Sequence, residues 1–175
     1  MPKPIIAIVG RPNVGKSTLF NRLVEERLAI VSDTAGTTRD RLYGNAQFAG
    51  REFIVVDTGG LELDLRSDLP GTPAAMLTGV HAQAQVAIDE ADAVIFVVDV
   101  EQGASPDDFE IANILRRTSK PVYLVANKAD NQARVLDTVE FFKLGLGEPL
   151  AISALHGVGT GDLLDQIVEL SLIHI

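Results

Sequence analysis

Short runs of apolar, mostly β-branched residues recur along the chain, and longer segments of mixed apolar and polar residues separate them. Four runs are nearly continuous in apolar residues, at 5–9, 53–57, 93–99 and 122–128. Strands have this pattern when helices cover both faces of their sheet, as in parallel sheets. The pattern therefore predicts an α/β fold, with a mostly parallel six-stranded sheet and helices on both faces.

The segment LYGNAQF differs from these runs because its apolar and polar residues alternate. It leads through Ala49 and Gly50 into REFIVVD, which predicts a hairpin and one antiparallel edge strand. The fragment ISAL at 152–155 is expected to end a short sixth strand. Helices are expected in the mixed segments, at 16–26, 75–89, 106–118, 135–143 and 161–170.

Two irregular segments, 28–41 and 59–74, interrupt this regular alternation. Pro70, Gly71 and Pro73 argue against a continuous helix in the second segment. Loops of this length inside a compact domain are commonly functional, and surface excursions without a role are the alternative.

Composition and charge narrow the class of protein. The chain has 175 residues, of which 46% are hydrophobic, so one well-filled domain is expected. No apolar run approaches the roughly 18 residues of a membrane span, so we expect no membrane partner and a cytoplasmic location. The net charge of −9 argues against direct nucleic-acid binding by this segment.

The stretch GRPNVGKS follows the first apolar run directly and precedes a predicted helix. Its Gly10, Gly15, Lys16 and Ser17 fit the pattern G-x-x-x-x-G-K-[ST] in the position that a phosphate-binding loop requires. Glycines let backbone N–H groups turn toward phosphate oxygens, and the helix N-terminus adds partial positive charge. Lys16 is expected to reach the β and γ phosphates, and the Ser17 hydroxyl to bind magnesium. The alternative is a glycine turn with an exposed lysine.

The run VYLVANKAD ends in the pattern N-K-x-D, formed by Asn127, Lys128 and Asp130. Ligands of open α/β sheets bind at this carboxyl end of the strands. Asp130 can accept hydrogen bonds from N1 and the 2-amino group of guanine, whereas adenine offers neither donor. The pattern therefore favours GTP and GDP and argues against a P-loop ATPase or kinase. Lys128 is expected to cover the ring, Asn127 to tie this loop to the phosphate loop, and the Ala154 N–H to donate to guanine O6. A surface turn after a strand is the alternative.

Asp57 ends the second apolar run and opens the pattern D-T-G-G. We expect its carboxylate to hold magnesium through a water molecule and the Gly60 N–H to contact the γ-phosphate. A second magnesium-binding hydroxyl is expected at Thr38, with Thr34 and Thr37 equally suited by chemistry alone. The γ-phosphate would order the irregular segments, and hydrolysis would release them.

Five motifs, GRPNVGKSTLFNRL, SDTAGTTRDRLYG, DTGG, NKAD and SAL, occur in this order. Together they resemble the first GTPase domain of the Der (EngA) family, bacterial ribosome-assembly GTPases of the Era/EngA-like group. The resemblance covers 3–170, and TTRDR with DTGG favours this family over Era and MnmE. It implies the small P-loop GTPase fold and GTP hydrolysis, and it places the switch threonine at Thr38.

In its usual form this family joins two GTPase domains to a KH-like RNA-binding domain and acts on the large ribosomal subunit. The chain carries one such domain, so the resemblance implies this partner for a full-length protein rather than for this segment. Two features depart from the family pattern: Ala35 stands where a proline is common, and LSLIHI replaces an acidic linker. The resemblance therefore implies a single GTPase domain at 3–170, with residues 171–175 as a truncated or non-native tail.

Leu61 lies just after D-x-x-G, where many GTPases have a glutamine that orients the attacking water. Similar GTPases with an apolar residue here use a potassium ion, held partly by a phosphate-loop asparagine that corresponds to Asn13. The resemblance therefore implies potassium stimulation, and ordinary turn chemistry is the alternative role for Asn13. Because leucine cannot hold water by hydrogen bonding, a slow-turnover, nucleotide-dependent binding module is the alternative function.

The predicted catalytic residues are Lys16, Thr38, Gly60 and Asn13. The predicted GTP-binding residues are Gly10, Arg11, Pro12, Asn13, Val14, Gly15, Lys16, Ser17, Asp57, Thr58, Gly59, Gly60, Leu61, Asn127, Lys128, Ala129, Asp130, Ser153 and Ala154. The predicted metal ligands are Ser17, Thr38 and Asp57 for magnesium and Asn13 for potassium.

Overall fold

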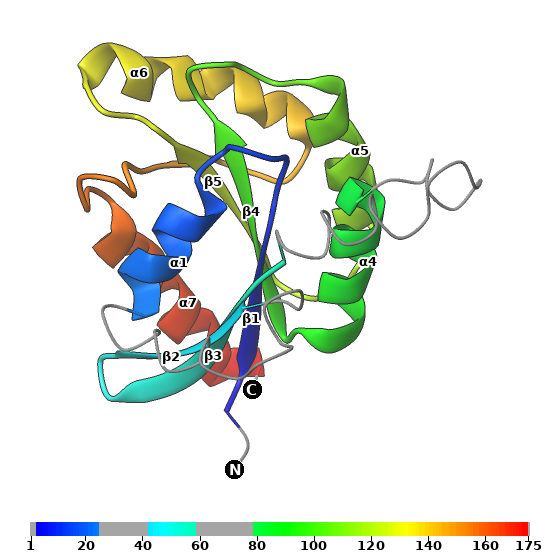
Figure 1. The fold of residues 1–175 in the computed structure, drawn as a ribbon, viewed down its shortest axis with the longest axis vertical. Helices are drawn as coiled ribbons and strands as arrows, with labels where there is room; N and C mark the ends of the chain where they lie inside the picture. The colour runs from blue at the N-terminus through cyan, green and yellow to red at the C-terminus, as the bar shows by residue number, and fades with distance from the viewer. Residues whose placement is uncertain (1–2, 25–41, 59–78, 175) are drawn as a thin grey trace.

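The computed structural model describes residues 3–24, 42–58 and 79–174 (Figure 1). Within these residues six strands form one sheet in the order β2-β3-β1-β4-β5-β6. The strands are β1 (Ile5–Val9), β2 (Leu42–Phe48), β3 (Arg51–Asp57), β4 (Ala93–Asp99), β5 (Val122–Asn127) and β6 (Leu150–Ala151). Only the β2–β3 pair is antiparallel among these described strands. The predicted sheet, with its one antiparallel edge strand, is confirmed.

The β2–β3 hairpin has the turn that the sequence predicts. Its register runs from Leu42 opposite Asp57 to Phe48 opposite Arg51. The two turn residues, Ala49 and Gly50, have φ angles of 54° and 78°. Two successive left-handed residues match the right-handed twist of the strands that they join.

Helices cover both faces of the sheet (Figure 1). Helices α1 (Lys16–Val24) and α7 (Thr160–His174) share one hydrophobic core with the sheet. The opposite core contains α4 (Gly79–Glu90), α5 (Pro106–Leu115) and the 3-10 helix η2 (Asp137–Leu144). Successive strand residues alternate between the two cores: Ile6 and Ile8 belong to the first, and Ala7 and Val9 to the second. This two-sided burial explains why the strand sequences are continuous in apolar residues.

Helix α5 is shorter than the predicted helix at 106–118. It begins as expected, with Ser105 as N-cap and Pro106 in the first turn, but it ends at Leu115. The N–H groups of Arg117 and Thr118 bond to carbonyls three residues back, on Ile114 and Leu115. The tighter turn therefore replaces the α-helical hydrogen bonds that the prediction assumed.

The predicted single helix at 135–143 is wrong. The structure has a short α6 (Gln132–Leu136) followed by the 3-10 helix η2. The Asn131 side chain accepts a hydrogen bond from the Arg134 N–H at 3.0 Å, which starts the helix earlier than its apolar pattern indicates. Gly145, in the left-handed conformation with φ 74°, ends η2.

The other element boundaries agree more closely with the sequence. Strands β1 and β4 have the predicted limits, and α7 continues to His174. The sixth strand is Leu150–Ala151, so the expectation that ISAL at 152–155 ends it is wrong. Ser153 instead forms an isolated antiparallel bridge with Val158. The predicted helical residues 25–26 and 75–78 lie outside the described residues. None of the helices in the described part of the chain is long and apolar enough to span a membrane.

Candidate nucleotide-binding site

The predicted site residues converge at the carboxyl edge of the sheet. The onward connections of the adjacent strands β1 and β4 run to opposite sides of the sheet, β1 toward β2 and β3 and β4 toward β5. Open α/β sheets form their ligand crevice at such a point. The segment after β1 passes over this edge before it enters α1 (Figure 1). Asp57, Asp99 and Asn127 end β3, β4 and β5 at this same edge of the sheet.

The loop at 10–17 has a backbone that requires glycine at both glycine positions of the pattern. Gly10 and Gly15 have φ angles of 156° and 102°. A Cβ on Gly10 would lie 2.6 Å from the Val97 carbonyl oxygen, and one on Gly15 would overlap Asn127 Nδ2. The glycines are therefore required by close contacts as well as by conformation.

Lys16 lies within the loop rather than in solvent. Its side chain is buried, and Nζ donates to the carbonyl oxygens of Gly10 at 2.5 Å and Arg11 at 2.8 Å. The ammonium group is thus held above the loop at the start of α1, where the helix N-terminus also favours an anion. This burial does not fit a plain glycine turn with an exposed lysine.

Ser17 and Asp57 are brought together although 40 positions separate them in the sequence. The Ser17 hydroxyl donates to Asp57 Oδ2 at 3.1 Å, and Asp57 is 3% exposed. A hydroxyl and a carboxylate oxygen side by side are the hard donors that Mg²⁺ prefers, so these residues fit that ion. The described residues contain no cluster of three or more His, Cys, Asp or Glu side chains for another metal.

Asn127 connects two loops of the site. Its Nδ2 donates to the Val14 carbonyl at 2.9 Å, and its Oδ1 accepts from the Ala154 N–H at 2.9 Å. The expected tie between the N-K-x-D segment and the phosphate loop is therefore present. The Ala154 N–H, expected to donate to guanine O6, donates to Asn127 in this structure.

The side chains of Lys128 and Asp130 contact different loops of the site: Lys128 contacts the phosphate loop, and Asp130 contacts Ser153. Lys128 has a left-handed backbone with φ 71°, and its Nζ donates to the Asn13 carbonyl at 3.0 Å and to Asp99 Oδ2 at 2.9 Å. Asp130 is exposed, and its Oδ1 accepts from the Ser153 hydroxyl at 2.7 Å. The carboxylate is thus oriented by a neighbouring loop while it stays accessible to a ligand.

Some predicted residues have other environments. The Thr58 hydroxyl donates to the Ile8 carbonyl at 2.7 Å, so its side chain joins β3 to β1 rather than facing a ligand. The Arg11 guanidinium is bonded to α5 and to the segment before it. Ala129 is buried. Thr38, Gly59, Gly60 and Leu61 lie outside the described residues.

Two residues of the site were missed in the sequence. Asp99 is fully buried and holds the Lys128 ammonium; it ends a long apolar run as Asp57 does, which is a signal that could have identified it. Arg22 donates from α1 to the carbonyls of Ala154 at 3.0 Å and Leu155 at 2.7 Å. Nothing in the sequence around Arg22 indicates that it contacts the loop at 154–155.

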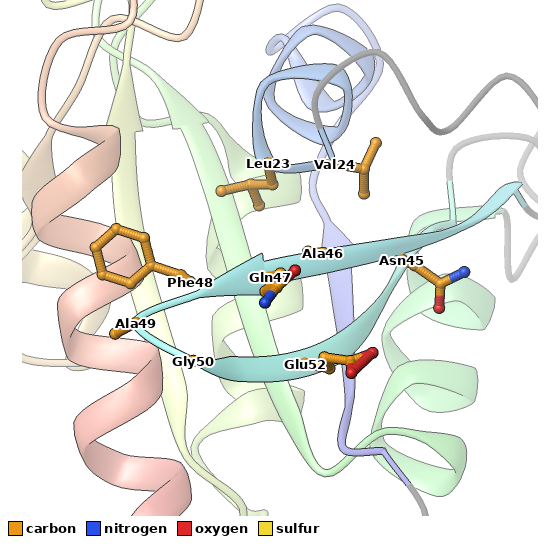
Figure 2. Close-up of a pocket in the computed structure, with 9 residues that line it drawn as sticks. All are labelled: Leu23, Val24, Asn45, Ala46, Gln47, Phe48, Ala49, Gly50 and Glu52. Carbon is orange, nitrogen blue, oxygen red and sulfur yellow. The ribbon is translucent and has the colours of Figure 1, made fainter.

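A separate pocket of about 370 Å³ lies between the end of α1 and the β2–β3 hairpin (Figure 2). Leu23 and Val24 line it on one side and hairpin residues on the other. Figure 2 shows the Phe48 ring extending from the hairpin toward α7. None of the predicted nucleotide-site residues lines this pocket.

The fold and the geometry of the loop at 10–17 together define a P-loop nucleotide-binding domain. The model of the 50S ribosome-binding GTPase family matches residues 5–128. The chain belongs to this GTPase family.

Curated relatives named GTPase Der share 58% identity with the chain in Herpetosiphon aurantiacus and 59% in Chloroflexus aggregans, each over 97% of the chain. The chain spans 37% of the length of these relatives. The resemblance to the Der family that the motifs indicate is thereby confirmed.

Solved structures of Era proteins have the same fold. The chain is similar to a single-residue variant of Aquifex aeolicus Era bound to GDP·AlF4⁻, with a TM-score of 0.69 and 33% identity over 100% of this chain and 57% of that one. A second Era structure is a complex with MgGDPNP and a segment of 16S ribosomal RNA. The chain matches it with a TM-score of 0.68 and 30% identity, over 97% of this chain and 57% of that one. The P-loop GTPase fold is therefore confirmed, and the higher identity to Der proteins favours Der over Era.

Proposed function

We propose that this chain binds GTP and GDP with magnesium and hydrolyses GTP by direct attack of water. The observation that carries this proposal is the meeting of two motifs at one sheet edge. The loop at 10–17 supplies backbone N–H groups and Lys16 for phosphates, and Asp130 supplies an accessible carboxylate for the guanine edge. Asn127 fixes the spacing between the two through Val14.

Ser17 and Asp57 are the described residues that would hold magnesium. Bound there, the ion would neutralise phosphate charge and offset the charge that develops during transfer. Thr38 is proposed as a further hydroxyl ligand. The 30%-identical Era structure with MgGDPNP supports a magnesium nucleotide in this fold.

Catalysis would depend on positioning and charge stabilisation rather than on a covalent intermediate. Lys16 would hold the β and γ phosphates, and the Gly60 N–H would contact the γ-phosphate. Asn13 would contribute its side-chain oxygen to a potassium ion; its backbone carbonyl accepts from Lys128, and its φ of 69° is a turn conformation that asparagine tolerates. Leu61 favours the second candidate, a slow-turnover nucleotide-dependent binding module.

The proposed wider role is assembly of the large ribosomal subunit, in a cytoplasmic protein. It is supported by the description of the family as ribosome-binding and by the Der name of the relatives. The net charge of −9 argues against RNA contact through this domain itself. Ribosome binding is therefore proposed for a longer protein that contains this domain.

The test is binding and turnover with the purified chain. GDP should bind in the presence of Mg²⁺ and ADP should compete at least about a hundredfold less well, because adenine lacks the donors that Asp130 accepts. GTP turnover faster in potassium than in sodium at matched ionic strength would support the enzyme. Tight GDP binding with equal and negligible turnover in both salts would favour the binding module. Equal affinity for ADP and GDP would contradict the proposal.

A further inference from the structure

The Arg11 side chain leaves the phosphate loop and enters the region around α5. Its Nε donates to Asp108 Oδ1 at 3.0 Å, Nη1 to Gln102 Oε1 at 2.9 Å, and Nη2 to the Gly103 carbonyl at 3.3 Å. The Arg11 side chain is 12% exposed and that of Asp108 is 0% exposed. Three directed bonds from one largely buried planar group fix its position more strongly than a surface ion pair would.

Asp108 also belongs to the start of α5. It is the third residue of a capping box, in which Oδ2 accepts from the Ser105 N–H at 3.0 Å and the Ser105 hydroxyl accepts from the Asp108 N–H. One carboxylate oxygen therefore caps the helix and the other holds Arg11. Both oxygens accept from N–H donors, and this arrangement favours the ionised carboxylate.

The electrostatic balance of Asp108 depends on Arg11. Burial raises the pKa of Asp108 above 3.8, and the contacts with Ser105 and Arg11 lower that pKa and so offset part of the effect. Removing the guanidinium would leave a fully buried carboxylate with only the Ser105 contacts. A buried carboxylate without a cationic partner is costly, so the segment around Asp108 would have to shift or the carboxylate would have to take up a proton.

The backbone of Arg11 is part of the phosphate site itself. Its carbonyl accepts from Lys16 Nζ at 2.8 Å, directly after the Gly10 carbonyl that accepts from the same ammonium. The later part of the loop is held through the Asn13 and Val14 carbonyls, by Lys128 and Asn127. Arg11 is the tether at the beginning of the loop, and its partner lies outside the nucleotide-binding motifs.

We propose that Arg11 and Asp108 are positioning residues for the phosphate loop, in which Asp108 on α5 holds the loop and the Lys16 ammonium in the conformation that binds the β-phosphate. This inference rests on the proposed binding of guanine nucleotides. Neither side chain touches the nucleotide in this role. Their effect reaches the phosphates through the Arg11 backbone and Lys16.

The variants Asp108→Asn and Arg11→Lys test the pair separately. An asparagine presents an amide NH₂ to one of the two donors that the carboxylate now satisfies, and a lysine can reach one of the three acceptors rather than all three. Each variant should weaken GDP binding about tenfold. The double variant should lose no more than the weaker-binding single variant, because the two residues act as one unit.

The readout that separates positioning from stability is the ³¹P resonance of the β-phosphate at saturating GDP. A moved loop shifts this resonance in the bound state, whereas a loss of stability alone does not. Arg116→Gln is the matched control, because Arg116 at the other end of α5 donates to the Leu144 carbonyl and the Asn113 side chain, away from the loop. It should lower the melting temperature and leave GDP affinity and the ³¹P shift unchanged.

Weaker GDP binding with a shifted ³¹P resonance in Arg11→Lys or Asp108→Asn, and neither change in Arg116→Gln, is the expected result. If Asp108→Asn does not fold, Arg11→Lys carries the test, because its side chain is nearer the surface. Parent GDP affinity and parent ³¹P shift in the folded variants would overturn the inference and leave the proposed function intact. Absence of GDP binding by the parent chain would overturn both.

Discussion

Asn127→Ala should destabilise the chain and loosen its nucleotide site at the same time. The side chain is 3% exposed and makes two hydrogen bonds of 2.9 Å, to the Val14 carbonyl and from the Ala154 N–H. Val14 and Ala154 are themselves fully buried, so alanine would leave two backbone groups without this partner where water has poor access. At about 1–3 kcal/mol for each of the two groups, the free energy of unfolding should fall by about 2–6 kcal/mol.

Urea unfolding of the nucleotide-free protein measures this change, and GDP titration measures the site. GDP affinity should fall at least about tenfold, because the phosphate loop and the loop at 153–154 would lose their shared connection. Asn131→Ala is the control: it removes an exposed helix cap that accepts from the Arg134 N–H, for about 1 kcal/mol, and should leave GDP affinity unchanged. An Asn127→Ala protein within about 0.5 kcal/mol of the parent and with parent GDP affinity would refute this reasoning.

Three further variants test other parts of the site. Lys16→Ala should weaken GTP binding far more than it lowers the melting temperature, since the ammonium meets concentrated phosphate charge; equal effects on both would indicate a structural lysine. Gly15→Ala should abolish GDP binding in titrations, because its Cβ would overlap Asn127 Nδ2; retained binding would show that the loop can move aside. Asn13→Ala should remove most of the potassium stimulation of single-turnover hydrolysis and preserve GDP affinity, and unchanged stimulation would exclude Asn13 as the ligand.

Strand positions and the two nucleotide motifs were predictable from the sequence because each depends on local pattern. The continuous apolar run 93–99 becomes β4 with both faces buried, and the glycine spacing gives the phosphate loop its backbone. The division of 135–143 into α6 and η2 was not predictable from apolar spacing. It depends on the Asn131 cap and on the change from α-helical hydrogen bonds, four residues back, to 3-10 hydrogen bonds, three residues back. The two helix types place apolar side chains at nearly the same spacing, so the sequence pattern does not distinguish them.

The partners of the site residues were also beyond sequence reasoning. Arg11 and Asp108 are 97 positions apart, and Lys128 and Asp99 are 29 apart. Which aspartate meets which cation is decided by strand order and by the turn before α5, and many acidic residues of the chain would serve equally by chemistry. The sequence therefore identified the motif residues that the structure brings together better than the groups that hold them in place.

The most direct test of guanine recognition is nucleotide preference in Asp130→Asn. Asp130 is exposed and oriented by the Ser153 hydroxyl, so asparagine should fit without loss of fold. The amide can donate to the 2-oxo group of xanthine but cannot accept both donors of guanine, and two lost bonds to a charged group are worth about 3 kcal/mol or more. GDP affinity should fall at least about a hundredfold while xanthosine diphosphate affinity rises. Unchanged preference for GDP in a folded Asp130→Asn protein would contradict the assignment of this sheet edge as a guanine-nucleotide site.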